Sequence, residues 1–161
     1  MPLSKAEREF HRKTAARCFN EAWTLLEKPR RSRGDDLRLL GLAHASRFHW
    51  GLVGTAEAQA VGDWQLSRVY ADLRSPDLAL RYARSCLDLC EQHHLRQFLG
   101  TADEALARAY AVARNFPAAD RHLARARRRL AEAPIDREDR AVFDSQIRDT
   151  ERWIRRLAGR G

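Results

Sequence analysis

The segment HASRFHW gathers side chains that can contact a ligand or move a proton, among them His44, His49 and Trp50. On a helix the two histidines point about 140° apart, so they do not form the i, i+4 pair that holds a metal ion. They can still supply a polar contact or a proton-transfer group to a small molecule. The other interpretation is hydrogen bonding and packing between helices, and the sequence favours it.

Cys86, Cys90 and His94 are successively four residues apart and fall on one helical stripe. Each step along such a stripe turns by about 40° around the helix axis, so the three side chains do not converge in the geometry that a tetrahedral ion requires. Buried free cysteines are common in protein cores. The sequence therefore favours packing, and we expect no metal ion and no cofactor.

Two arginines, Arg68 and Arg108, occupy equivalent places in a segment that is written twice. Residues 66–89 align without a gap on residues 106–129, forty positions later, and Asp63 upstream falls on Asp103. Most shared positions have a packing role, namely Leu66 and Leu106, Tyr70 and Tyr110, Ala79 and Ala119. Packing does not explain the two arginines, and their guanidinium groups suit a carboxylate or a phosphate.

A repeat of this period is typical of helical hairpins that bury their apolar faces by stacking. Capping and breaker residues predict seven helices near residues 4–27, 35–52, 55–73, 76–94, 98–113, 117–133 and 136–158, with Asp35 or Asp36 capping the second. No stretch alternates with a period of two, so no sheet is expected. The prediction is one all-α domain over 1–161: a loosely matching first pair (1–54), two repeat units (55–95 and 96–133) and a C-terminal capping helix (134–161).

Composition narrows the classes of function. The formal charge of +8 favours acidic partners, but the arginines are scattered among acidic residues, which indicates solvated helix faces rather than a nucleic-acid surface. The densest basic run, RHLARARRRL, is expected to face the last helix and its carboxylates, Asp136, Asp139, Asp144 and Asp149. The first residues lack a secretory pattern, no run is long enough to span a membrane, and three cysteines fit a reducing compartment. A cytoplasmic location is expected.

The duplicated segment resembles the tetratricopeptide repeat. The positions that carry the resemblance are Leu66, Ser67, Tyr70, Ala79 and Cys86, then Leu106, Ala107, Tyr110, Ala119 and Ala126. The chain departs from the pattern in two ways: Arg74 and Arg114 replace the turn glycine, and the spacing is forty instead of thirty-four. The resemblance implies a right-handed array of antiparallel hairpins in which the first helix of each pair lines a concave groove.

A narrower resemblance covers about residues 18–131. The patterns HAS-x-x-HW and W-x-x-SRVY are similar to those of a family of small bacterial cytosolic proteins without an assigned activity. This resemblance implies a fold and a bacterial cytosolic origin, and it implies no reaction.

The leading prediction is a non-enzymatic interaction module that binds a peptide or helix, or a second copy of the chain. Carried onto this chain, the tetratricopeptide groove would display Trp64, Arg68, Asp72, Thr101, Glu104 and Arg108, and two convergent arginines favour a partner with acidic character. Internal pairing of the arginines with Asp72 and Glu104, with Trp64 in the core, explains the same residues equally well. An alternative function is a small-molecule binding protein or enzyme that combines His44, His49, Trp50 and Arg68.

Overall fold

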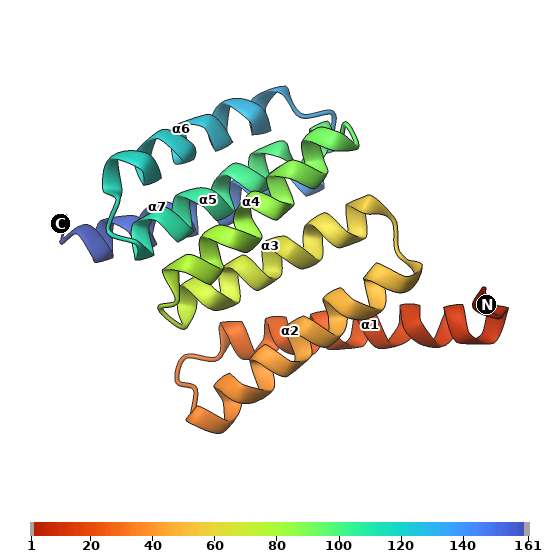
Figure 1. Cartoon of the computed structure of the whole chain (residues 1–161). Helices are drawn as coiled ribbons and strands as arrows, with labels where there is room; N and C mark the ends of the chain where they lie inside the picture. The colour runs from red at the N-terminus through yellow and green to blue at the C-terminus, as the bar shows by residue number, and fades with distance from the viewer. Residues whose placement is uncertain (1, 160–161) are drawn as a thin grey trace.

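The computed structural model describes residues 2–159, which form seven α-helices and no strand (Figure 1). The all-α prediction is confirmed for this part of the chain. The helices are α1 (Lys5–Glu27), α2 (Arg33–Val53), α3 (Ala56–Asp72), α4 (Pro76–Gln92), α5 (Leu99–Val112), α6 (Phe116–Glu132) and α7 (Arg137–Ala158), and a short 3-10 turn (Arg96–Phe98) precedes α5.

Most helix starts follow the predicted caps, and one does not. Ser4 and Glu7 form the predicted capping box of α1. The predicted cap of α2 at Asp35 or Asp36 is wrong, because Ser32 caps the helix and Asp35 is its capping-box partner. Hydrogen bonds from Lys28 and from the Ser32 backbone lower the pKa of Asp35 to about 2. The sequence pattern does not separate a cap from its reciprocal partner when both residues are good capping types.

Three helical hairpins pack side by side, α1 with α2, α3 with α4 and α5 with α6, and α7 lies against α5 and α6 (Figure 1). The period of forty extends to α2, the second helix of the first hairpin, in the pattern of burial. The buried positions of α2, α4 and α6 correspond as Leu39, Ala79 and Ala119, then Ala43, Ala83 and Leu123, then Ser46, Cys86 and Ala126. The sequence matches α2 to the later helices only loosely because the residue types differ, although these three positions are buried in all three helices.

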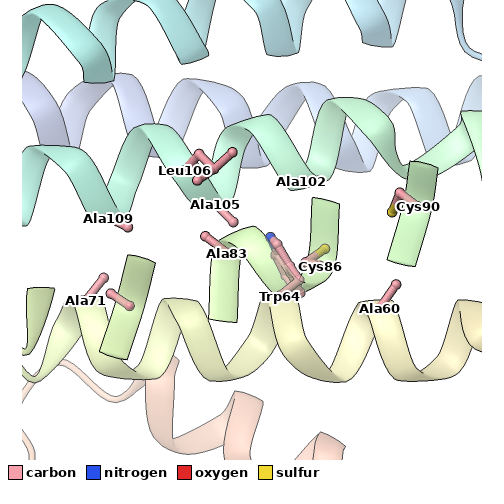
Figure 2. Packing of buried hydrophobic residues seen from close by; sticks show 11 residues of the cluster. Ala60, Trp64, Ala71, Ala83, Cys86, Cys90, Ala102, Ala105, Leu106 and Ala109 are labelled. Carbon is pink, nitrogen blue, oxygen red and sulfur yellow. The ribbon is translucent and has the colours of Figure 1, made fainter. Parts of the chain in front are cut away.

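The core between α3, α4 and α5 is built from small side chains around Trp64 (Figure 2). Its members include Ala60, Ala71, Ala83, Ala102, Ala105, Ala109, Cys86 and Cys90. Small residues allow the helices to approach closely, and the Trp64 indole and the Leu106 side chain fill space that remains between them. This close approach fixes the positions of α3 and α5, the two helices that carry all six predicted groove residues.

The two arginines that replace the turn glycine contact the last helix. Arg74 and Arg114 have left-handed φ angles of 59° and 63°, which glycine adopts more easily. The guanidinium of Arg74 lies 4.6 Å from the centre of the Trp153 ring, and Arg114 donates a hydrogen bond of 2.8 Å to the carbonyl of Leu157. Their side chains therefore hold α7 against the hairpins, a role that glycine cannot perform.

Replacing Gly100 by alanine is expected to lower the free energy of unfolding by about 1–2 kcal/mol. A Cβ atom there would lie 3.1 Å from the carbonyl oxygen of Ala126 and 3.2 Å from the Leu130 nitrogen, and backbone atoms cannot move aside cheaply. Gly34→Ala is the matched control, because its nearest neighbour would be the Ser32 hydroxyl at 3.6 Å. Urea unfolding followed by circular dichroism compares the two, and equal stabilities would contradict the tight α5–α6 contact.

Candidate functional site

A buried polar cluster joins α3, α5 and α7 around Glu104, which is only 1% exposed. The Trp64 indole Nε1 donates to one carboxylate oxygen of Glu104 at 2.7 Å. The Thr150 hydroxyl of α7 donates to the other oxygen, and the Arg68 guanidinium lies 3.5 Å from it. Glu104 therefore holds the indole and the last helix at the same time.

Arg68 and Arg108 lie together and share one carboxylate, that of Asp149 on α7. Each guanidinium donates to Asp149 Oδ2 at 2.6 Å. Burial raises the pKa of Asp149, but the two arginines outweigh this and hold it below its ordinary value. The structure thus brings the two repeat-equivalent arginines together, and the carboxylate between them belongs to the protein itself.

Asp72 and two tryptophans complete the surroundings of this pair. Asp72 lies 3.7 Å from Arg108 and 3.4 Å from Arg31. The guanidinium of Arg68 lies 5.3 Å from the centre of the Trp23 ring, a distance at which cation–π attraction operates. Internal pairing accordingly describes the contacts of Asp72, Glu104 and both arginines.

The prediction that Asp149 faces the basic run of α6 is wrong. Arg125 and Arg129 of that run bind Asp103 of α5 at 2.7 and 2.8 Å, and His122 binds the same carboxylate at 2.8 Å. Burial raises the pKa of Asp103, but the bonds from His122 and Arg125 outweigh it and lower the pKa. Arg127 of the same run does bind α7, at 2.7 Å from Glu151, so the arginines of α6 are divided between carboxylates of α5 and of α7.

Asp63 of α3 binds side chains of neighbouring helices, as Asp103 of α5 does. It is buried, accepts a hydrogen bond of 2.6 Å from Arg47 of α2 and another of 2.6 Å from the Ser85 hydroxyl of α4. The shared aspartate of the repeat is therefore a buried carboxylate that ties neighbouring helices together. The sequence shows that Asp63 corresponds to Asp103. The burial of both carboxylates, each bound to neighbouring helices, explains why both repeat units have an aspartate at this position.

An open cleft of about 690 Å³ lies beside the polar cluster, between α1, α3, α5 and α7. Its lining is mostly apolar: Phe19 and Trp23 from α1, Val61 and Trp64 from α3, Phe98, and Ala141, Val142 and Phe143 from α7. The polar members are Asn20, Glu27, Thr101, Ser145 and Gln146. Of the six predicted groove residues, Trp64 and Thr101 line it. The buried Thr101 hydroxyl has no hydrogen-bond partner among the residues that the structure describes.

Two smaller hollows share side chains with the cleft. One, of about 270 Å³, shares Phe19, Val61 and Phe98 and adds Trp50, so this secondary candidate lies at the edge of the groove. The other, of about 430 Å³, shares Phe98 and Phe143 and adds the carboxylates of Glu57, Asp136 and Asp139. Phe98 lines all three hollows, so they lie next to one another, and their charged lining groups are Glu27, Glu57, Asp136 and Asp139.

The other candidate residues are not brought into one pocket. His44 lies 2.8 Å from the Tyr70 hydroxyl, and His49 lies 2.6 Å from His11, whereas Arg68 faces Glu104 and Asp149. Burial lowers the pKa of His44, and burial together with the charge of His11 lowers that of His49. A pocket that combines both histidines with Arg68 therefore has no support in these contacts.

The cysteine stripe ends before its third member. Cys86 and Cys90 are buried on α4, but the helix ends at Gln92 and His94 has a left-handed φ of 54°. A hydrogen bond with Cys90, burial and nearby carboxylates raise the pKa of Cys86 well above its ordinary value, so it is a thiol. Within residues 2–159 no three His, Cys, Asp or Glu side chains are grouped to hold a metal ion.

Comparison with models of protein families, with curated proteins and with solved structures found no match. None of the helices in residues 2–159 combines the length and the apolar character needed to cross a bilayer.

Proposed function

We propose that this protein is a non-enzymatic interaction module whose cleft between α1, α3, α5 and α7 binds a segment of another polypeptide. The observation that carries the proposal is an open, mostly apolar cleft walled by aromatic side chains. Aromatic residues are the usual anchors of protein interfaces.

The arrangement of the three hollows supports an elongated ligand. Phe98 lines the cleft and both neighbouring hollows, Phe19 is shared with one and Phe143 with the other, so an extended peptide or a helix in the cleft can reach both. A helix presents apolar residues at i, i+3 and i+4 to such a groove. The parallel placing of first helices along one groove also agrees with the proposed tetratricopeptide-like architecture.

The chemistry of the lining favours apolar anchors with basic flanks. An acidic partner was expected from Arg68 and Arg108, but both already hold Asp149. The charged groups that line the cleft and the two neighbouring hollows are carboxylates, Glu27, Glu57, Asp136 and Asp139. We therefore propose an amphipathic segment that places apolar side chains in the cleft and a lysine or arginine near its end.

The cysteines and the basic run of α6 bear on the cellular setting of the protein. The three cysteines are all free and buried, which fits a reducing cytosol, and we propose a cytoplasmic protein. A role in binding nucleic acid is disfavoured because Arg125, Arg127 and Arg129 of the basic run are paired with carboxylates.

The variant Val142→Arg tests the proposal. Val142 lines the cleft and is 52% exposed, so a long charged side chain there blocks the cleft without disturbing the core. Peptides selected from a random displayed library on the wild-type protein are expected to carry apolar residues at helical or alternate spacing. Their affinity for Val142→Arg should fall by at least about 30-fold, because burying an unpaired charge against apolar anchors costs about 2 kcal/mol or more.

Ala124→Arg is the matched control, since it adds the same charge at an exposed position of α6 away from the cleft. It is expected to leave the affinity unchanged. Selected peptides that bind Val142→Arg as tightly as the wild type would show that the cleft is not the binding site.

A further inference from the structure

The outward face of α2 differs from the equivalent faces of α4 and α6. The period of forty defines four exposed positions on each of these helices. On α4 they hold Asp77, Arg81, Arg84 and Asp88, and on α6 they hold Pro117, Arg121, Ala124 and Arg128. On α2 the same positions hold Leu37, Gly41, His44 and Phe48. Solvent-facing helix positions are usually charged, as they are on α4, so α2 has the composition of a covered face.

The exposed apolar side chains on this face are large and aligned. Leu37 is 63% exposed and Phe48 is 62% exposed, and Leu52 follows one turn further along. Phe10 of α1 is 61% exposed and lies near the Phe48 end of this face, since the His49 ring is 6.1 Å from the Phe10 ring and 5.4 Å from the Phe48 ring. Together the four apolar side chains present on the order of 400 Å² of surface, about half of what one partner contributes to a standard interface.

Gly41 adds a second observation in the middle of the face. A Cβ atom at this position would meet nothing within 4 Å, so the packing of the chain itself does not require glycine. Glycine weakens a helix relative to alanine, and it allows another helix to approach closely. Between Leu37 and Phe48 it leaves a shallow gap that a side chain from outside can fill.

We propose that α2 packs against α2 of a second copy of this chain, antiparallel across a two-fold axis that passes between Gly41 and His44. This register sets Leu37 against Phe48 of the second copy. It also sets Gly41 against the helix turn that carries the second copy's His44, whose imidazole stays 2.8 Å from the Tyr70 hydroxyl of its own chain. A two-fold contact requires such a self-complementary surface.

Charge favours the same occupant. On α2 the exposed positions after Arg38 are uncharged as far as Leu52, so the face offers nothing to a strongly charged partner. The antiparallel register brings Arg33 of each copy to the C-terminal end of the other α2. That end carries the negative end of the helix dipole, which attracts a cation.

Sedimentation velocity over a range of protein concentrations tests the proposal with Gly41→Arg, which introduces the residue that α4 carries at the equivalent position. The wild type is expected to sediment as a reversible dimer. The variant is expected to weaken dimerisation by at least about 100-fold, because two arginines meet the apolar face of the opposite copy. Arg81→Ala, an equivalent position on α4, is the control and should leave the dimer intact.

The monomer fold is checked in the same samples. Gly41→Arg should keep the helical circular dichroism and the thermal midpoint of the dilute wild type, since the position has open space around it. The variant should also bind peptides in the cleft as the wild type does, because other residues line the cleft. A wild type that is monomeric throughout, a Gly41→Arg variant that still dimerises, or an Arg81→Ala variant that does not dimerise would each overturn the proposal.

Discussion

Replacing Glu104 by alanine is expected to lower the free energy of unfolding by about 3–5 kcal/mol, the range for breaking a buried ion pair. The substitution leaves the Trp64 indole and the Thr150 hydroxyl without their acceptor. It also leaves Arg108, whose side chain is 3% exposed, near Arg68 with less negative charge around them. Urea unfolding followed by tryptophan fluorescence measures the loss.

Two further variants separate charge from shape at this position. Glu104→Gln keeps an oxygen that can accept from Trp64 and removes the charge, so its cost should lie between those of wild type and alanine. Glu132→Ala removes an exposed carboxylate at the end of α6 and should change stability by less than about 0.5 kcal/mol. A Glu104→Ala protein within about 1 kcal/mol of the wild type would mean that the cluster does not hold the helices together.

Replacing Asp103 by alanine should cost about 2–4 kcal/mol. The carboxylate is completely buried and binds three side chains of α6, Arg125, Arg129 and His122. The cost is smaller than that of Glu104→Ala because the side chains of Arg125 and Arg129 are 38% and 25% exposed and can turn towards water. Asp88→Ala, at an exposed position of α4, is the control and should be nearly neutral.

The pH dependence of stability gives an independent check on Asp103. Its pKa in the folded protein lies below the ordinary value of 3.8, so the folded state binds its proton less readily than the unfolded state. The stabilisation is therefore complete above the ordinary pKa and is lost as the pH falls through the folded value. Chemical unfolding of wild type below about pH 4 should show this decline, and Asp103→Ala should show less of it. Equal slopes for the two proteins would contradict the assignment.

Much of the architecture was readable from local patterns in the sequence. Capping residues such as Ser4 and Thr55, and prolines after turns, mark helix ends because they act on backbone groups within a few residues. The doubling of residues 66–89 predicted paired helices because each unit must bury the same apolar stripe. These signals are local, so no knowledge of distant partners was needed.

The contacts between residues far apart in the chain could not be predicted from such local patterns. Arg68 and Arg108 were recognised as residues outside the packing pattern, but any acidic residue in the chain, or in a ligand, could have paired with them. Only the three-dimensional course of α7 shows that Asp149 is that residue. The cleft was equally hidden, because its walls come from Phe19, Trp23 and Val142 on helices at opposite ends of the chain.

The most direct test of the proposed function is a nuclear magnetic resonance titration of the isotope-labelled wild-type protein with the tightest selected peptide. If the cleft is the binding site, the largest chemical-shift changes will fall on residues that line it, including the Trp23 indole, Val61, Thr101 and Val142, while the outward faces of α4 and α6 stay unchanged. Shifts concentrated on those outward faces, with the cleft residues unmoved, would contradict the account.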